Sequence, residues 1–143
     1  RRVTLLGILK GSAIFAADLA RAVGEPAELS FCQARSYGAG TESSGTVYLS
    51  ELETEVIQGR PVVVCDAVLD TGRTLRTVLA AVRAAGATEV ASCVLVDKEP
   101  CRVVDVSADW VGFPMDGRFF VGYGLDHAGA YRTLPYVGVV EER

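Results

Sequence analysis

The sequence predicts an α/β domain with a mostly parallel central sheet that is flanked by helices. Short apolar runs alternate with longer segments of helical periodicity, and several of these runs are continuous, as in strands buried on both faces. The chain has 143 residues and half of them are apolar, which is enough for one domain with a sizeable core. No repeat or linker divides it, so we expect residues 1–143 to form a single domain.

The first half of the chain should contribute three strands and one helix. A near-continuous apolar run at residues 3–9 predicts a strand, and the helix that follows should end before Gly24. A second strand is expected at residues 29–34 and a short third one at residues 47–49. The stretch between them, residues 36–45, is polar and glycine-rich without an apolar face, which predicts a long exposed loop.

The second half continues the alternation around a central strand at residues 62–65. A helix is expected at residues 75–85, and its apolar face should consist of Leu75, Val78, Leu79 and Val82. Another buried strand should follow at residues 90–96. Three short apolar segments then complete the chain, at residues 110–113, 119–124 and 136–140. In the first of these, we expect Trp110 and Phe113 to lie in the core.

Composition and charge exclude several classes of function. The net charge of −4 argues against nucleic acid as an electrostatic partner, and no apolar run approaches the roughly 20 residues of a membrane span. The four cysteines form no C-x-x-C pair, so neither a zinc ribbon nor a redox motif is indicated. His127 is the only histidine, which argues against a histidine-rich metal centre. We expect a soluble, reduced, cytoplasmic protein.

The segment from Asp66 to Thr74 is the most informative part of the chain. The central strand is expected to stop at Asp66, and a second acid, Asp70, then precedes Thr-Gly-Arg-Thr and a helix. Such a turn directs backbone N–H groups and a helix N-terminus at one point, which favours a bound phosphate. The two acids could meet sugar hydroxyls, a hydrated Mg²⁺ or a ring nitrogen. The alternative is an ordinary turn in which both acids only cap the helix.

Two other polar groups should join this segment at one edge of the sheet. Lys10-Gly11-Ser12 follows the first predicted strand, and Asp97-Lys98 follows the strand at residues 90–96. Ligands of open α/β sheets bind at the carboxyl ends of the strands, where these groups converge. A phosphate cradle beside acids and lysines indicates a site for a phosphorylated sugar.

The chain resembles the hypoxanthine-guanine phosphoribosyltransferases, a branch of the type I phosphoribosyltransferase fold. Six segments carry the resemblance in order: LLGILKGS, SYGAGTESSG, VVVCDAVLDTGRTL, LVDK, WVGFPMDGRFFVGYGLD and YRTLPYVG. For the fold, the resemblance implies a small C-terminal hood beside the sheet. For the function, it implies a Mg²⁺-dependent glycosyltransferase (pentosyltransferase) of purine salvage. Such an enzyme transfers the 5-phosphoribosyl group of 5-phosphoribosyl-1-pyrophosphate (PRPP) to hypoxanthine or guanine and yields IMP or GMP plus pyrophosphate.

The resemblance also implies roles for individual residues. Asp70 would face N7 of the purine as general acid or base, and Lys98 would donate to the 6-oxo group. The 5′-phosphate would be held by the turn, with Thr71, Gly72, Arg73 and Thr74. The pyrophosphate would meet a loop that often holds a non-proline cis peptide bond in this family, here Leu9, Lys10 and Gly11.

The remaining implied roles concern the purine face, the metal and the leaving group. Phe119 would stack on the purine, and the backbone of Phe120 would meet its edge. Asp66 would bind a ribose hydroxyl and would hold Mg²⁺ together with Asp126, while Arg132 would grip pyrophosphate.

A mobile lid and an oligomer are implied as well. Ser36 and Tyr37 would begin the lid, which keeps water away from the reacting sugar carbon. The family usually forms dimers or tetramers, so a homodimer or homotetramer is expected.

Two departures from the family pattern bear on function. Ala67 stands where the family usually has the second of two adjacent acids, so sugar binding should be weaker by about 1.5–3 kcal/mol. The helix and strand that usually precede LLGILKGS are absent from this sequence. Ala67 supports the alternative of a sensor that binds PRPP or nucleotide with little turnover, whereas Asp70 and Lys98 support the enzyme.

Overall fold

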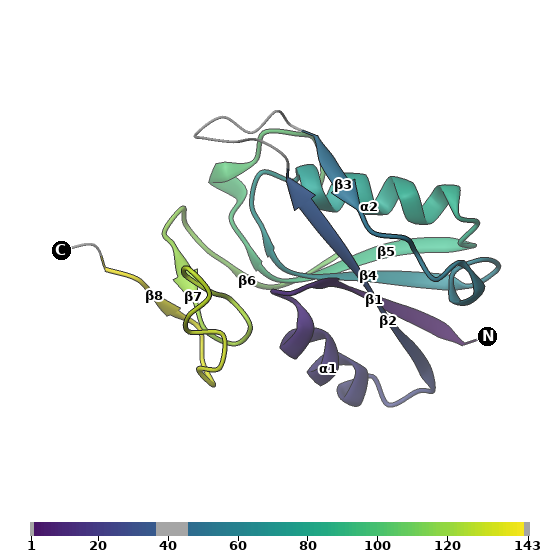
Figure 1. Cartoon of the computed structure of the whole chain (residues 1–143), viewed down its shortest axis with the longest axis horizontal. Helices are drawn as coiled ribbons and strands as arrows, with labels where there is room; N and C mark the ends of the chain where they lie inside the picture. The colour runs from purple at the N-terminus through teal and green to yellow at the C-terminus, as the bar shows by residue number, and fades with distance from the viewer. Residues whose placement is uncertain (1, 37–45, 142–143) are drawn as a thin grey trace.

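A six-stranded sheet forms the centre of the protein in the computed structural model, which describes residues 2–36 and 46–141 (Figure 1). The strand order is β3-β2-β1-β4-β5-β6, and all neighbours are parallel except β3, which runs antiparallel to β2. The strands are β1 (Val3–Leu9), β2 (Ala27–Ser36), β3 (Val47–Leu49), β4 (Pro61–Leu69), β5 (Glu89–Asp97) and β6 (Trp110–Pro114). The predicted α/β class and strand succession are confirmed.

Two helices cover opposite faces of the sheet, α1 (Ala13–Ala22) and α2 (Arg73–Ala84) (Figure 1). The side chains that α2 buries are the four predicted for its apolar face: Leu75, Val78, Leu79 and Val82. Successive residues of β1 and β4 point to opposite faces, so Leu6 and Val64 pack on the α2 side while Leu5 and Cys65 pack on the α1 side. Both faces of the sheet are therefore buried, which explains the continuous apolar runs. Two 3₁₀ turns, η1 (Thr54–Val56) and η2 (Glu99–Cys101), lie in the connections.

The C-terminal part forms a small hood beside the carboxyl ends of the central strands (Figure 1). Its two short strands, β7 (Phe120–Val121) and β8 (Gly138–Val139), pair antiparallel in a sheet of their own. The hood is attached to α1, because the Tyr123 hydroxyl donates a hydrogen bond to Asp18. It also approaches the loop after β1 so closely that a Cβ on Gly124 would lie 2.5 Å from the carbonyl oxygen of Gly11.

Two expectations about the strands were wrong. The central strand does not stop at Asp66 but continues to Leu69, because its ladder with β5 continues through Val68–Val96 and Leu69–Asp97. Trp110 and Phe113 are not in the core: they are 56% and 54% exposed, because β6 is the edge strand of the sheet and all its residues are exposed. The predicted loop at residues 36–45 lies outside the described residues apart from the backbone of Ser36, which ends β2.

The helices in the described ranges are short, and the four cysteines form no disulfide. No helix in the described ranges is long and apolar enough to cross a membrane. Cys32, Cys65, Cys93 and Cys101 are free thiols. Burial raises the pKa of Cys32 to about 11 and that of Cys65 to about 12.

Candidate active site

The register between β4 and β5 brings two charged side chains of the predicted site together. Leu69 pairs with Asp97, and the Lys98 backbone N–H donates to the Leu69 carbonyl at 2.9 Å. The next residues, Asp70 and Lys98, therefore lie side by side, with 3.6 Å between Lys98 Nζ and Asp70 Oδ2. Lys98 is buried and Asp70 is half exposed, so the pair presents the carboxylate toward open space.

A cavity of about 280 Å³ opens beside this pair. It is lined by side chains from the ends of β4 and β5, the loop after β1, and the hood: Gly11, Val68, Asp70, Lys98, Phe119, Phe120, Leu125, Asp126 and Arg132. Most of the side chains predicted for the purine, the metal and the pyrophosphate thus meet in one place.

Two phenylalanines give this cavity an aromatic wall. Phe119 lines the cavity and is 51% exposed, and its ring and that of His127 form a T-shaped pair with centroids 5.4 Å apart and planes at 77°. Phe120 is buried, and Lys98 Nζ lies 5.8 Å from its ring centroid. A planar apolar ligand could lie on Phe119 while its polar edge meets Lys98 and Asp70.

A second, smaller cavity of about 80 Å³ adjoins the first at the turn between β4 and α2. It is lined by Asp66, Val68, Leu69, Asp70, Thr71, Gly72, Thr74 and Leu75. Gly72 caps α2 with φ +92°, and the Thr71 hydroxyl accepts a hydrogen bond from the Arg73 backbone N–H at 3.3 Å. The N–H groups of a first helical turn have no acceptor within their helix, so this turn can bind an anion.

Asp66 and Ala67 occupy opposite faces of β4. Asp66 lines the small cavity, where burial raises the pKa of its carboxyl group to about 7 although its Oδ1 accepts the Ala67 backbone N–H at 2.8 Å. Ala67 is 1% exposed and packs in an apolar cluster with Leu95, Phe120 and Leu125. Asp66 therefore faces the small cavity, whereas Ala67 faces the apolar cluster.

The loop after β1 has the backbone feature that the family resemblance implied. The peptide bond between Leu9 and Lys10 is cis. The Ser12 hydroxyl donates to the Ile8 carbonyl at 2.7 Å and holds the turn into α1. Lys10 is exposed, and it is Gly11 rather than Lys10 that lines the large cavity.

Asp126 and Arg132 face each other in the hood, with 3.2 Å between Arg132 Nη2 and Asp126 Oδ1. Arg132 also donates to the Gly124 carbonyl at 2.7 Å, and the Gly129 N–H donates to Asp126 Oδ2 at 2.8 Å. Among the described residues, no group of three or more His, Cys, Asp or Glu side chains could hold a metal ion. A Mg²⁺ would fit here as an ion bound by one or two carboxylates and completed by substrate phosphates and water.

Some site residues were missed, and others lie outside the described part. Asp97 was expected to join Lys98 at the site, but it pairs with Arg102, because neighbouring residues at a strand end point in opposite directions. No sequence motif indicated Arg102; only its position four residues after Lys98 could have drawn attention to it. Tyr37 falls outside the described residues, as does the rest of the predicted lid after Ser36.

Comparison with known proteins agrees with this geometry. Residues 1–128 match the model of the phosphoribosyl transferase domain. The hypoxanthine-guanine phosphoribosyltransferase of Streptococcus pneumoniae R6 is 40% identical over 138 residues, which are 96% of this chain and 77% of that protein. The hypoxanthine phosphoribosyltransferase of Salmonella typhimurium LT2 is 41% identical over 138 residues, 96% of this chain and 78% of that protein.

Solved structures show the same similarity in three dimensions. A hypoxanthine phosphoribosyltransferase from Staphylococcus aureus superposes with a TM-score of 0.92 at 34% identity, covering 99% of this chain and 77% of that one. A hypoxanthine-guanine phosphoribosyltransferase from Bacillus anthracis gives 0.91 at 36% identity, with coverages of 99% and 83%. The chain therefore belongs to the phosphoribosyl transferase family and, within it, to the hypoxanthine-guanine phosphoribosyltransferases.

Proposed function

We propose that this chain catalyses purine salvage by transferring the 5-phosphoribosyl group of PRPP to hypoxanthine or guanine, with pyrophosphate as the second product. The observation that carries the proposal is the Lys98–Asp70 pair, a buried cation and an exposed carboxylate 3.6 Å apart on the wall of an aromatic cavity. The phosphate-binding turn begins at the same aspartate. One residue thus joins a place for a flat base to a place for a sugar phosphate.

The pair can read one edge of a 6-oxopurine. O6 and N7 are neighbouring atoms on that edge, where O6 accepts a hydrogen bond and a protonated N7 donates one. Lys98 would donate to O6 while Asp70 accepts from N7. A 6-aminopurine would direct an N–H group at the ammonium of Lys98, so that both groups are donors. Sites built on such buried polar contacts reject the mismatched analogue by a factor of about 10⁴.

The same geometry supports a reaction sequence. N9 of the purine forms the bond to C1 of the sugar, the proton on N7 passes to Asp70, and the bond from C1 to the pyrophosphate oxygen breaks. Phe119 would hold the purine by stacking, and the backbone of Phe120 would meet its edge. The turn with Thr71, Gly72, Arg73 and Thr74 would hold the 5′-phosphate.

The leaving group and the metal would meet the other walls of the site. The backbone of Leu9, Lys10 and Gly11 would bind pyrophosphate together with Arg132. Asp126 and Asp66 would be the carboxylate ligands of Mg²⁺, which supplies charge neutralisation to the pyrophosphate when bound. Ser36 and Tyr37 would begin the lid.

A steady-state assay tests the proposal with PRPP, Mg²⁺ and each of three purines: hypoxanthine, guanine and adenine. Nucleotide should form from the two 6-oxopurines, with kcat/KM for adenine lower by about 10⁴. Asp70→Asn should lower kcat by about 10²–10⁴, because it removes the proton acceptor and keeps the shape. Absence of nucleotide from either 6-oxopurine, in a folded protein, would contradict the proposal.

A second candidate function rests on Ala67. Its methyl group, 1% exposed among Leu95, Phe120 and Leu125, gives the sugar no acceptor from this face of β4. A sensor that binds PRPP or nucleotide with little turnover would fit that feature. Calorimetric binding of PRPP with Mg²⁺ but no nucleotide formation would favour the sensor over the enzyme.

Assembly and location stay predictions. We expect a homodimer or homotetramer in the cytoplasm. Light scattering coupled to gel filtration would measure the assembly, and a monomer at micromolar concentration would contradict it.

A further inference from the structure

The phosphate-binding turn rests on the segment that runs from η2 to β6. The Thr71 carbonyl accepts hydrogen bonds from the backbone N–H groups of Val103 at 3.0 Å and Val104 at 3.3 Å. A Cβ on Gly72 would lie 2.5 Å from Val106 Cγ1 and 2.8 Å from Arg102 Cδ. This segment, none of whose residues lines the small cavity, is therefore in direct contact with the turn.

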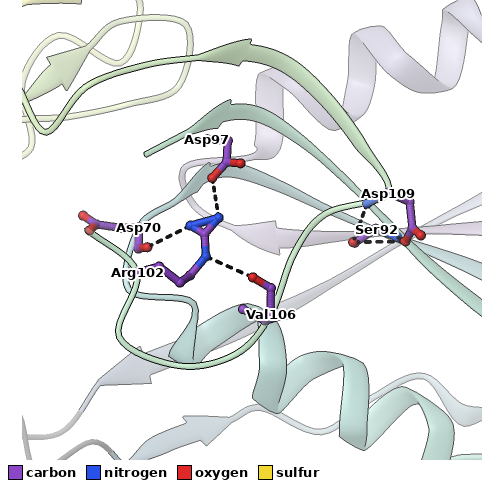
Figure 2. Close-up of polar contacts among 6 residues, drawn as sticks. All are labelled: Asp70, Ser92, Asp97, Arg102, Val106 and Asp109. Carbon is purple, nitrogen blue, oxygen red and sulfur yellow. Dashed lines mark hydrogen bonds and ion pairs between the residues drawn. The ribbon is translucent and has the colours of Figure 1, made fainter. Parts of the chain in front are cut away.

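Arg102 connects this segment to both strand ends of the site. Figure 2 shows its guanidinium group between three acceptors that come from different parts of the chain. Nη2 donates to the Asp97 carboxylate at the end of β5, Nη1 approaches the Asp70 carbonyl at 3.4 Å, and Nε donates to the Val106 carbonyl at 3.1 Å. The Arg102 and Asp97 side chains are only 13% and 17% exposed, so water screens this ion pair little.

Two of these contacts reach the two residues that would read the purine, one at the Asp70 backbone and the other through the side chain of Asp97. The Asp70 carbonyl belongs to the general acid or base itself, and Asp97 immediately precedes Lys98. We propose that Arg102 is a positioning residue that holds Asp70 and Lys98 in their relative placement and supports the phosphate-binding turn from behind. This inference rests on the proposed function, because it assigns Arg102 to that same site.

Positioning of Asp70 and Lys98 in this way requires arginine rather than lysine at position 102. A guanidinium is planar and donates in several fixed directions, whereas an ammonium is a compact point charge on a flexible stem. Lysine at this position could keep the ion pair with Asp97, but it could not also reach the Asp70 and Val106 carbonyls in the same geometry. A substitution to lysine therefore separates charge pairing from positioning.

The same segment offers a matched control at its other end. The Asp109 carboxylate accepts the Ser92 backbone N–H at 2.8 Å and lies 3.3 Å from the Ser92 hydroxyl. Figure 2 shows this pair at the start of β6, away from the site. It anchors the same segment to β5 but touches neither Asp70 nor Lys98, so Asp109→Ala loosens the segment without loosening the pair.

The experiment compares four proteins: the wild type, Arg102→Met, Arg102→Lys and Asp109→Ala. The melting temperature of each protein is measured first. The values of kcat, and of KM for PRPP and hypoxanthine, are then measured at a temperature well below the lowest melting temperature. Arg102→Met keeps the aliphatic stem against Gly72 and removes every donor. We expect it to lower kcat/KM for PRPP by about ten- to hundredfold, the factor expected for a lost charge-assisted hydrogen bond.

The other variants decide between positioning and general stability. Arg102→Lys should recover most of the melting temperature but little of kcat/KM, and Asp109→Ala should lower the melting temperature while kcat and both KM values stay within about twofold. Unchanged kcat/KM in Arg102→Met would overturn the proposal. So would an Asp109→Ala protein that loses as much kcat/KM as Arg102→Met does.

A separate binding measurement distinguishes failure of the proposed function from failure of the role proposed for Arg102. If the wild type forms no nucleotide, that function fails, and the same variants are compared by calorimetric titration with inosine monophosphate and Mg²⁺. The affinity should then fall about ten- to hundredfold in Arg102→Met and stay unchanged in Asp109→Ala. Equal affinity in Arg102→Met and wild type would overturn the role of Arg102.

Discussion

Ala67→Asp should have two opposing effects: tighter binding of PRPP and a lower free energy of unfolding of the protein without substrate. The Ala67 side chain is 1% exposed in a cluster with Phe120 and Leu125. A Cβ on Gly11 would lie 3.8 Å from the Ala67 Cβ, and both Gly11 and Leu125 line the large cavity. A carboxylate at position 67 would therefore start in an apolar cluster and end at the edge of the large cavity.

The two effects can be given magnitudes. A charged hydrogen bond to a ribose hydroxyl contributes about 1.5–3 kcal/mol, which would lower KM for PRPP by about ten- to hundredfold. In the protein without substrate, a carboxylate that replaces the Ala67 methyl group loses part of its hydration, which costs about 1–3 kcal/mol of unfolding free energy. Since the sugar would restore the lost hydrogen bonds, saturating PRPP and Mg²⁺ should remove most of that destabilisation.

The assay combines steady-state kinetics over a range of PRPP concentrations with urea unfolding in the presence and absence of PRPP and Mg²⁺. Ala67→Asn is the matched control, because it has nearly the same shape without the charge and should lower KM less. The reasoning is refuted if Ala67→Asp unfolds cooperatively, like the wild type, while KM for PRPP stays within about twofold. In that case position 67 does not face the sugar.

Five further predictions follow from single residues. Gly72→Ala should raise KM for PRPP about tenfold or more, because φ +92° and the contact with Val106 leave no room for a methyl group. Lys98→Met should lower kcat/KM for hypoxanthine about ten- to hundredfold and raise that for adenine, because the donor that opposes the 6-amino group is gone. Phe119→Ala should raise KM for the purine about tenfold and leave urea stability within about 0.5 kcal/mol, because the ring is 51% exposed. With pKa values raised to about 11 and about 12, Cys32 and Cys65 should resist iodoacetamide at about pH 8 until the protein unfolds. Stability should fall above about pH 9, where only the unfolded chain releases these two protons; a flat profile would contradict this.

The parts of the fold that were predicted correctly are those set by local pattern. The run at residues 3–9 is apolar on both faces of the strand, apart from Thr4, because both faces of β1 are covered, and such a run has few alternatives to a buried strand. The four apolar positions of α2 repeat at helical spacing because one side of the helix packs on the sheet. The turn before α2 was recognisable because a buried strand gives way to Asp-Thr-Gly-Arg-Thr and then to a helical pattern, and its glycine adopts a positive φ.

The errors concern features that depend on a partner elsewhere in the chain. Polarity suggested that β4 stops at Asp66, but a strand ends where its ladder ends, and β5 continues the ladder as far as Leu69. Trp110 looked like a core residue by its type, yet its exposure follows from the edge position of β6, which composition does not reveal. Arg102 is indistinguishable from a surface cation until the pleat turns Asp97 toward it.

The pairing of Asp70 with Lys98 depends on sheet register rather than on either residue alone. Asp70 and Lys98 are neighbours only because Leu69 pairs with Asp97, one position before the strands end. A slip of one residue between β4 and β5 would move every side chain of one strand to the other face and separate the carboxylate from the ammonium. The turn at Gly72 leaves no room for such a slip, because a Cβ at Gly72 would already lie 2.5 Å from Val106 Cγ1. Substitutions that weaken the β4–β5 ladder should therefore impair the choice of base before they impair phosphate binding, because the ladder sets the base-reading edge whereas the turn sets its own anion site.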